Sequence, residues 1–131
     1  MADIFISYKT ERRAVAEHLA DILEDHGYSV WYDYAMLSGR DFARQIEAEL
    51  EAAQVVLVLW CDLSVDSDWV RSEARYAKAT GKLLPSLVTD CTLPVEFNGD
   101  QARDLRQWTG EPVPYQPRVL LDDIAERLDR A

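Results

Sequence analysis

Short runs of consecutive apolar residues alternate along this chain with longer stretches whose apolar residues recur every three to four positions. The apolar runs predict strands at 4–7, 28–32, 55–60 and 82–88, and an uninterrupted run such as 55–60 is typical of a strand buried on both faces. The periodic stretches predict amphipathic helices, the last of them at 118–130. This alternation calls for a parallel sheet that is covered by helices on both faces.

Right-handed crossovers favour a flavodoxin-like α/β fold of three layers, with a five-stranded parallel sheet in the order 2-1-3-4-5. In such a sheet a ligand binds beyond the carboxyl ends of strands 1 and 3, where the winding of the chain reverses. Those ends lie at 7–9 and 60–62, so any active site is expected there. A length of 131 residues suits one domain, 1–131, and is too short for two cores.

Several residues predict local features of these elements. Thr10 and Ser67 each precede a periodic stretch and are placed to cap a helix. Pro85 cannot donate a ladder hydrogen bond, so its strand should be bulged or lie near an edge. Prolines interrupt 98–117, where 104–108 is expected to form one helical turn.

Charge and cysteine content restrict the partners and the compartment. The chain has 14 Lys and Arg against 24 Asp and Glu, a net charge of −10, which repels nucleic acid and anionic membranes. Cys61 and Cys91 are too few for a disulfide framework, which suits a reducing compartment. No apolar run approaches the length of a membrane span, and the N-terminal residues lack the pattern of a secretory signal. A cytoplasmic protein is therefore expected.

Common cofactor and metal motifs are missing from the sequence. It contains neither GxGxxG nor GxxxxGK[ST], which argues against a Rossmann dinucleotide site and a phosphate loop. His18 and His26 have no partners at metal-binding spacing, so no metal is expected. A phosphate-accepting receiver domain would need an Asp at the end of strand 3, where this chain has Trp60 and Cys61.

One pair of side chains stands out on the helix that follows strand 3. Trp69 and Glu73 are four residues apart and therefore share one helix face, one turn from each other. A Glu beside a Trp on a helix is more often a solvated charge next to a core anchor. The position of this helix beside the predicted cleft is what makes Glu73 a candidate functional residue.

Three segments in register resemble the motifs of Toll/interleukin-1 receptor (TIR) domains. Asp-Ile-Phe-Ile-Ser-Tyr at 3–8 resembles their first conserved box, and Ser-Asp-Trp-Val-Arg-Ser-Glu at 67–73 resembles their Ser-x-Trp-x-x-x-Glu segment. Residues 33–39 stand where the family has its BB loop, although the Arg and Pro usual in that loop are absent. The resemblance extends from Asp3 to the last predicted helix.

The family contains members that only associate with other TIR domains and enzymes that cleave NAD+ at the nicotinamide–ribose bond. The Glu of the Ser-x-Trp-x-x-x-Glu segment distinguishes the enzymes from the other members. The resemblance therefore implies a bacterial-type, NAD-cleaving domain with Glu73 as its catalytic carboxylate. It implies NAD+ as substrate, no cofactor, and self-association with other TIR domains in immune or defence signalling. The substrate-binding residues that it implies are Ser7, Tyr8, Lys9, Asp33, Ser38, Gly39, Arg40, Trp60, Cys61, Ser67 and Trp69.

A single carboxylate suits this reaction. Nicotinamide leaves a cationic ring as a neutral molecule, so no general acid has to protonate it, unlike the leaving group of an ordinary glycoside. The transition state needs negative charge and a hydrogen-bond acceptor near the ribose, where positive charge develops. Glu73 can supply both.

Two alternatives remain open. A non-catalytic TIR module could bind other TIR domains, for example as a mimic of host adaptors, because function does not follow from fold. An enzyme with the same kind of cleft could instead act on another N-glycoside, as deoxyribosyltransferases do.

Overall fold

A parallel five-stranded sheet forms the centre of the computed structural model, which describes residues 2–32, 42–99, 102–106 and 118–129. The strand order is β2-β1-β3-β4-β5, which confirms the predicted flavodoxin-like α/β architecture. The strands are β1 (Ile4–Ser7), β2 (Val30–Trp31), β3 (Val55–Trp60), β4 (Leu83–Leu87) and β5 (Arg103–Asp104).

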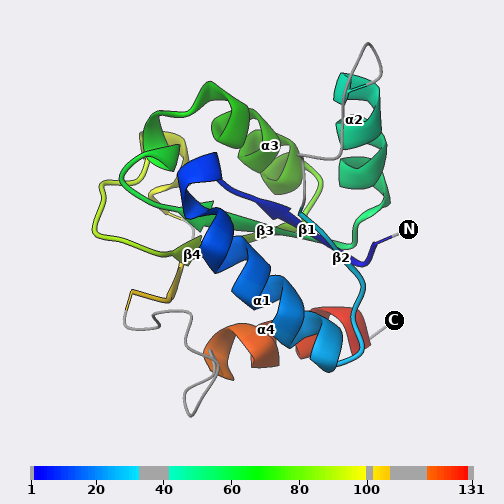
Figure 1. The fold of residues 1–131 in the computed structure, drawn as a ribbon. Coiled ribbons are helices and arrows are strands. Elements are labelled where there is room, and N and C mark those ends of the chain that lie inside the picture. The colour runs from blue at the N-terminus through cyan, green and yellow to red at the C-terminus, as the bar shows by residue number, and fades with distance from the viewer. Residues whose placement is uncertain (1, 33–41, 100–101, 107–117, 130–131) are drawn as a thin grey trace.

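Helices cover both faces of this sheet (Figure 1). They are α1 (Arg13–Asp25), α2 (Phe42–Ala52), α3 (Asp68–Ala79) and α4 (Arg118–Asp129). α1 and α4 pack on one face in a core that includes Ile4 and Ile6, and α2 and α3 pack on the other in a core that includes Phe5. Consecutive residues of β1 thus face opposite layers, as the pleat of a strand requires.

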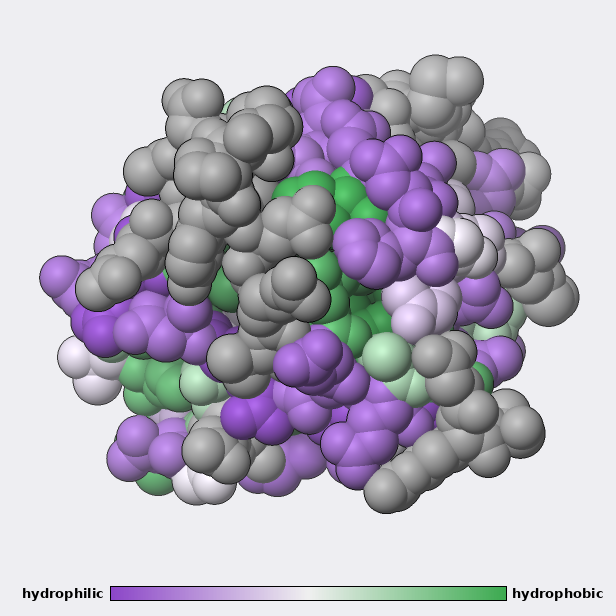
Figure 2. Space-filling model, turned by 90° about the horizontal axis from the view of Figure 1, so that it is seen from below, coloured by the Kyte–Doolittle hydropathy of each residue, from purple (hydrophilic) through white to green (hydrophobic). Residues whose placement is uncertain are grey.

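The view from below α1 and α4 shows how the apolar side chains are distributed on that side of the molecule. Hydrophobic residues show near the centre of this face, and hydrophilic residues border them on part of the described surface (Figure 2). Leu19 and Leu23 of α1 are buried there together with Leu120 and Ile124 of α4. The apolar stripes that predicted these helices are therefore directed toward the sheet.

β3 is the central strand, and its register with β1 determines which residues meet at the carboxyl edge. All of its residues are buried, as the uninterrupted apolar run predicted. Ser7, the last residue of β1, lies beside Val58, and β3 continues for two more residues to Trp60. Ser7 is therefore at the end of a strand with helical layers above and below it.

Pro85 lies in β4 in an uninterrupted register with β3, opposite Val58. Leu105 donates its backbone N–H to the carbonyl of Leu87, so odd-numbered residues of β4 face β5. β5 begins only opposite Ser86. The Pro85 nitrogen, which has no hydrogen to donate, thus faces the β5 side of β4 just before β5 begins, which agrees with the expected place near an edge.

Two local predictions were wrong. Thr10 does not cap α1: it begins a 3-10 turn (Thr10–Arg12), and its hydroxyl donates to the Glu11 carboxylate at 2.9 Å. Asp104 belongs to β5 and not to a helical turn; 107 and 108 lie outside the described residues. The edge strand forms because Leu105 is buried in the core and Arg103 pairs with Asp123 of α4.

Candidate functional site

Glu73 projects from α3 toward the carboxyl end of β1 and is only 5% exposed. The Ser7 hydroxyl donates a hydrogen bond to its Oε1 over 2.6 Å. This length is typical of a hydroxyl bound to a charged carboxylate, and such bonds offset part of the cost of burying charge. The bond connects residues 66 positions apart in the chain, so the fold itself sets the orientation of this carboxylate.

The local structure explains why these two side chains meet. Ser67 caps α3, and its Oγ accepts the backbone N–H of Val70 at 3.3 Å, as the sequence predicted. This cap determines where α3 begins and therefore which of its residues face the sheet. Ser7 faces the same layer as Phe5 because the two are separated by one residue of a strand.

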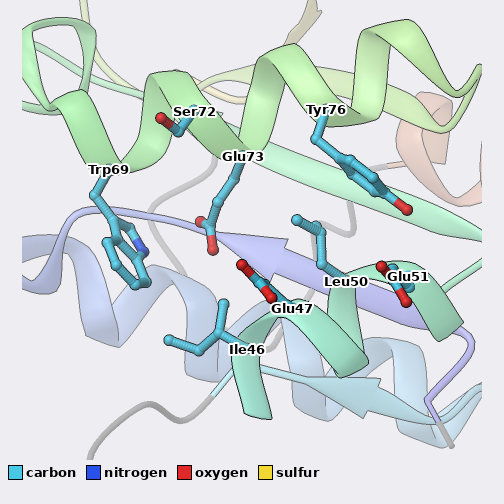
Figure 3. Close-up of a pocket in the computed structure, with 8 residues that line it drawn as sticks. All are labelled: Ile46, Glu47, Leu50, Glu51, Trp69, Ser72, Glu73 and Tyr76. Carbon is cyan, nitrogen blue, oxygen red and sulfur yellow. The ribbon is translucent and has the colours of Figure 1, made fainter. Parts of the chain in front are cut away.

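A pocket of about 440 Å³ lies between α2 and α3 beside Glu73 (Figure 3). Its volume is within the range of sites that bind small molecules and cofactors. The residues that line it are Ile46, Glu47, Leu50 and Glu51 from α2 and Trp69, Ser72, Glu73 and Tyr76 from α3.

The α3 side of this pocket is one face of the helix. Trp69, Glu73 and Tyr76 follow at intervals of four and three residues, so their side chains lie along one stripe. Trp69 and Tyr76 are seven residues apart, roughly 10 Å along the axis at 1.5 Å per residue. Trp69 is 42% exposed, so part of its indole surface is accessible. The carboxylate thus lies between two aromatic side chains.

Two of the predicted binding residues meet Glu73 in the described structure: Ser7 by its hydrogen bond and Trp69 in the lining of the same pocket. Tyr8 is 3% exposed and packs in the core with α1 and α4, on the face of the sheet opposite Glu73. A side chain there cannot border the pocket, because neighbouring residues of a strand point to opposite faces. Lys9 is half-buried, with its Nζ 4.0 Å from the Glu11 carboxylate.

Trp60 and Cys61 are fully buried and do not belong to the pocket lining. The Trp60 ring packs on Phe97 with 5.2 Å between centroids, and the Cys61 backbone N–H donates to the Ser64 hydroxyl at 2.7 Å. Both residues therefore build the core beside the carboxyl edge. The remaining predicted binding residues lie outside the described residues: Asp33, Ser38, Gly39 and Arg40.

Sequence reasoning missed four polar residues of the lining, which are Glu47, Glu51, Ser72 and Tyr76. Tyr76 could have been found from its spacing of three residues from Glu73. Glu47 and Glu51 are exposed residues of α2, and charged residues along a helix are typical of a solvated face. Their place in the pocket depends on the packing of α2 beside α3, which no local pattern shows.

A second carboxylate near the carboxyl end of β3 is held in an ion pair. Arg12 contacts Asp62 with 2.8 Å between Nη2 and Oδ1, and the hydrogen bond from this guanidinium lowers the pKa of Asp62. Asp62 also accepts the Thr89 hydroxyl at 3.2 Å. These contacts connect the turn after β1 with the segments after β3 and β4.

The part of the chain that the structure describes has neither a candidate metal cluster nor a membrane span. No group of three or more His, Cys, Asp or Glu residues there could hold a metal ion. No helix in these ranges combines the length and the apolar character that crossing a bilayer requires.

The chain was compared with known families, proteins and structures. A family model described as TIR domain matches residues 4–116. The crystal structure of the TIR domain of the Toll-related receptor TRR-2 from Hydra magnipapillata is similar, with 22% identity, a TM-score of 0.78, and coverage of 95% of this chain and 98% of that one. The TIR domains of the activated Roq1 resistosome, which directly recognises the pathogen effector XopQ, match with 14% identity, a TM-score of 0.64, and coverage of 96% and 98%. No curated protein matches the sequence.

Proposed function

The chain belongs to the TIR domain family, and on that premise we propose that it is an NAD+ glycohydrolase of the bacterial, NAD-cleaving type. The observation that carries the proposal is the position of Glu73. Its carboxylate is buried, bound by Ser7, and part of the lining of a pocket of about 440 Å³.

In this proposal Glu73 accepts hydrogen bonds from the ribose hydroxyls and favours the positive charge that develops on the sugar. The bond between the ribose carbon and the pyridinium nitrogen breaks, and its electron pair moves onto the nitrogen, so nicotinamide leaves neutral. Water then attacks the ribose carbon and loses a proton, which gives ADP-ribose. A preorganised carboxylate stabilises such a transition state without rearranging during the reaction.

Ser7 and Trp69 have supporting roles in this proposal. The short bond from Ser7 holds the Glu73 carboxylate in one orientation, which lowers the cost of aligning it with the sugar. Trp69 offers a partly exposed indole one turn away, and flat aromatic rings stack on such surfaces. Ile46 and Leu50 add an apolar wall from α2.

Nicotinamide release from NAD+ by the concentrated protein tests the proposal. We expect Glu73→Gln to abolish release while the melting temperature shows that the fold is kept. Glu17→Gln makes the same chemical change at an exposed position of α1, on the other face of the sheet, and should leave release unchanged. A Glu73→Gln variant as active as the parent would remove this residue from the mechanism.

We further propose that activity depends on association with other TIR domains, in immune or defence signalling in the cytoplasm. The TIR domains of Roq1 belong to an activated resistosome, and Trp69 lies partly exposed at the pocket of this chain. Release per protomer should therefore rise with protein concentration. A constant value over the range in which light scattering shows association would contradict this dependence.

A second candidate function is a TIR module that binds other TIR domains without turnover. Two partly exposed apolar side chains favour it, because exposed apolar residues suit an interface: Leu63, which precedes the 3-10 turn before α3, and Trp69, which lies in the first turn of α3. In that case concentrated protein would bind other TIR domains and leave NAD+ intact.

A further inference from the structure

Two carboxylates that the proposed reaction does not use line the same pocket from α2. Glu47 and Glu51 are one helical turn apart, and both are exposed. Figure 3 shows their side chains on the α2 side of the pocket, facing Glu73 and Tyr76 on α3. With Glu73 in the lining, the described wall carries three acidic side chains around one cavity.

Within the described residues, no lysine or arginine nitrogen lies within 4.0 Å of a Glu47 or Glu51 carboxylate oxygen. Lys82 approaches this end of the pocket, but its Nζ donates to the backbone carbonyl of Glu51 at 2.8 Å and lies 5.5 Å from the Tyr76 ring centroid. Arg44 is exposed one turn before Glu47. The described residues therefore leave both carboxylates open to a ligand.

The other walls of the pocket suit a flat ring. Trp69 and Tyr76 provide aromatic surfaces on α3, and Ile46 and Leu50 provide buried apolar surface on α2. The exposed carboxylates of Glu47 and Glu51 lie beside these walls and attract a positive charge that enters the pocket. A cationic aromatic ring satisfies both features: its faces contact the walls and its charge is attracted by the acidic groups.

We infer that Glu47 and Glu51 make this pocket selective for a ring that carries a positive charge. The identity of the ring rests on the proposed function: the nicotinamide of NAD+ is a pyridinium cation while it is attached to ribose and neutral after it leaves. The two carboxylates then attract the positive end of the substrate, keep its diphosphate away from the α2 side, and bind the released base less tightly.

Coulomb's law sets the size of the effect. A unit charge roughly 6 Å from a carboxylate in water gains a factor of about three in affinity, and two carboxylates together give about tenfold. Added salt screens charges at exposed positions, so the selectivity should decrease between 50 mM and 500 mM NaCl. These values apply to Glu47 and Glu51 because both are exposed.

Binding of 1-methylnicotinamide, a cation, and nicotinamide, its neutral counterpart, tests the inference by NMR titration without requiring turnover. We expect the parent to bind the cation more tightly than nicotinamide. In the double variant Glu47→Gln/Glu51→Gln the ratio of the two affinities should fall by about tenfold. Glu49→Gln removes one charge from α2 outside the pocket lining and should change the preference by less than about twofold. A double variant with the preference of the parent, or a parent that prefers nicotinamide, would overturn the inference.

The same titration separates this inference from the proposed function. If the parent does not cleave NAD+ but its preference for the cation depends on Glu47 and Glu51, the proposed reaction fails and the charge selectivity stands. If the parent cleaves NAD+ and the double variant keeps both the KM and the preference of the parent, the reaction stands and the selectivity is refuted.

Discussion

Replacing Ser7 by alanine removes the hydroxyl that holds Glu73, and we expect it to lower both stability and turnover. The two side chains are 0% and 5% exposed and 2.6 Å apart, so water cannot replace the lost donor easily. Losing a buried hydrogen bond to a charged group costs about 2 kcal/mol. With an unfolding entropy of roughly 2.1 cal/mol/K per residue, this cost lowers the melting temperature of a chain of this length by about 7 °C.

Thermal melts by circular dichroism measure this change, and two comparisons show whether its cause is the contact with Glu73. Ser86→Ala removes another fully buried strand hydroxyl, one whose Oγ has no hydrogen-bond partner among the described residues, and should leave the melting temperature within about 2 °C. In the Glu73→Gln background the Ser7 hydroxyl faces a neutral amide and not a carboxylate. Ser7→Ala should therefore lower the free energy of unfolding by only about 1 kcal/mol in that background.

The same variant tests the role of Ser7 in orienting the carboxylate. We expect kcat for nicotinamide release to fall by roughly tenfold with little change in KM, because alignment matters most in the transition state. The hydrogen bond does not hold Glu73 in place if Ser7→Ala has the melting temperature of the parent. The same conclusion follows if Ser7→Ala lowers the free energy of unfolding equally in the parent and in the Glu73→Gln background.

The remaining predictions concern the pocket, the helix cap and the carboxyl edge. Trp69→Ala should raise KM for NAD+ by roughly tenfold, because base stacking contributes about 1–3 kcal/mol, and should change stability little because the indole is partly exposed; an unchanged KM would exclude stacking there. Ser67→Ala removes the acceptor for the Val70 N–H and should cost about 1 kcal/mol, measured as the midpoint of urea unfolding, with Ser67→Asp restoring it. Arg106 hydrogen-bonds Asp104 and lowers its pKa from 3.8 to about 2. A carboxylate whose pKa is lowered in the folded state stabilises the fold at pH values above its ordinary pKa. This stabilisation is lost as the pH falls toward 2. Asp104→Asn should therefore melt below the parent at pH 7, and the difference should shrink between pH 4 and pH 2; a difference independent of pH would refute the linkage.

Much of the fold is predictable from the sequence because its pattern is strong where the core forms. The run at Val55–Trp60 could only be a buried strand, and alternation with periodic stretches then required a parallel sheet with two helical layers. β5 could not be found in this way. It has two polar residues, and the partners that hold it are far away in the chain: β4, with which it pairs in parallel, and Asp123 of α4, which contacts Arg103.

The candidate site was predictable in part for similar reasons. The spacing of Trp69 and Glu73 gives the face of α3, and strand alternation gives the side on which Ser7 lies. The same alternation argues against grouping Tyr8 with Ser7, and the structure places Tyr8 on the opposite face. Glu47 and Glu51 look like any solvated helix face until α2 is placed beside α3.

Whether Glu73 is the catalytic carboxylate is decided by chromatographic quantification of the nicotinamide formed from NAD+ by the parent and by Glu73→Gln at matched, high protein concentration. We expect one nicotinamide for each NAD+ consumed by the parent and a rate lower by roughly 100-fold or more in the variant, with both proteins folded. Equal rates, or intact NAD+ with a parent that is demonstrably assembled, would contradict this expectation.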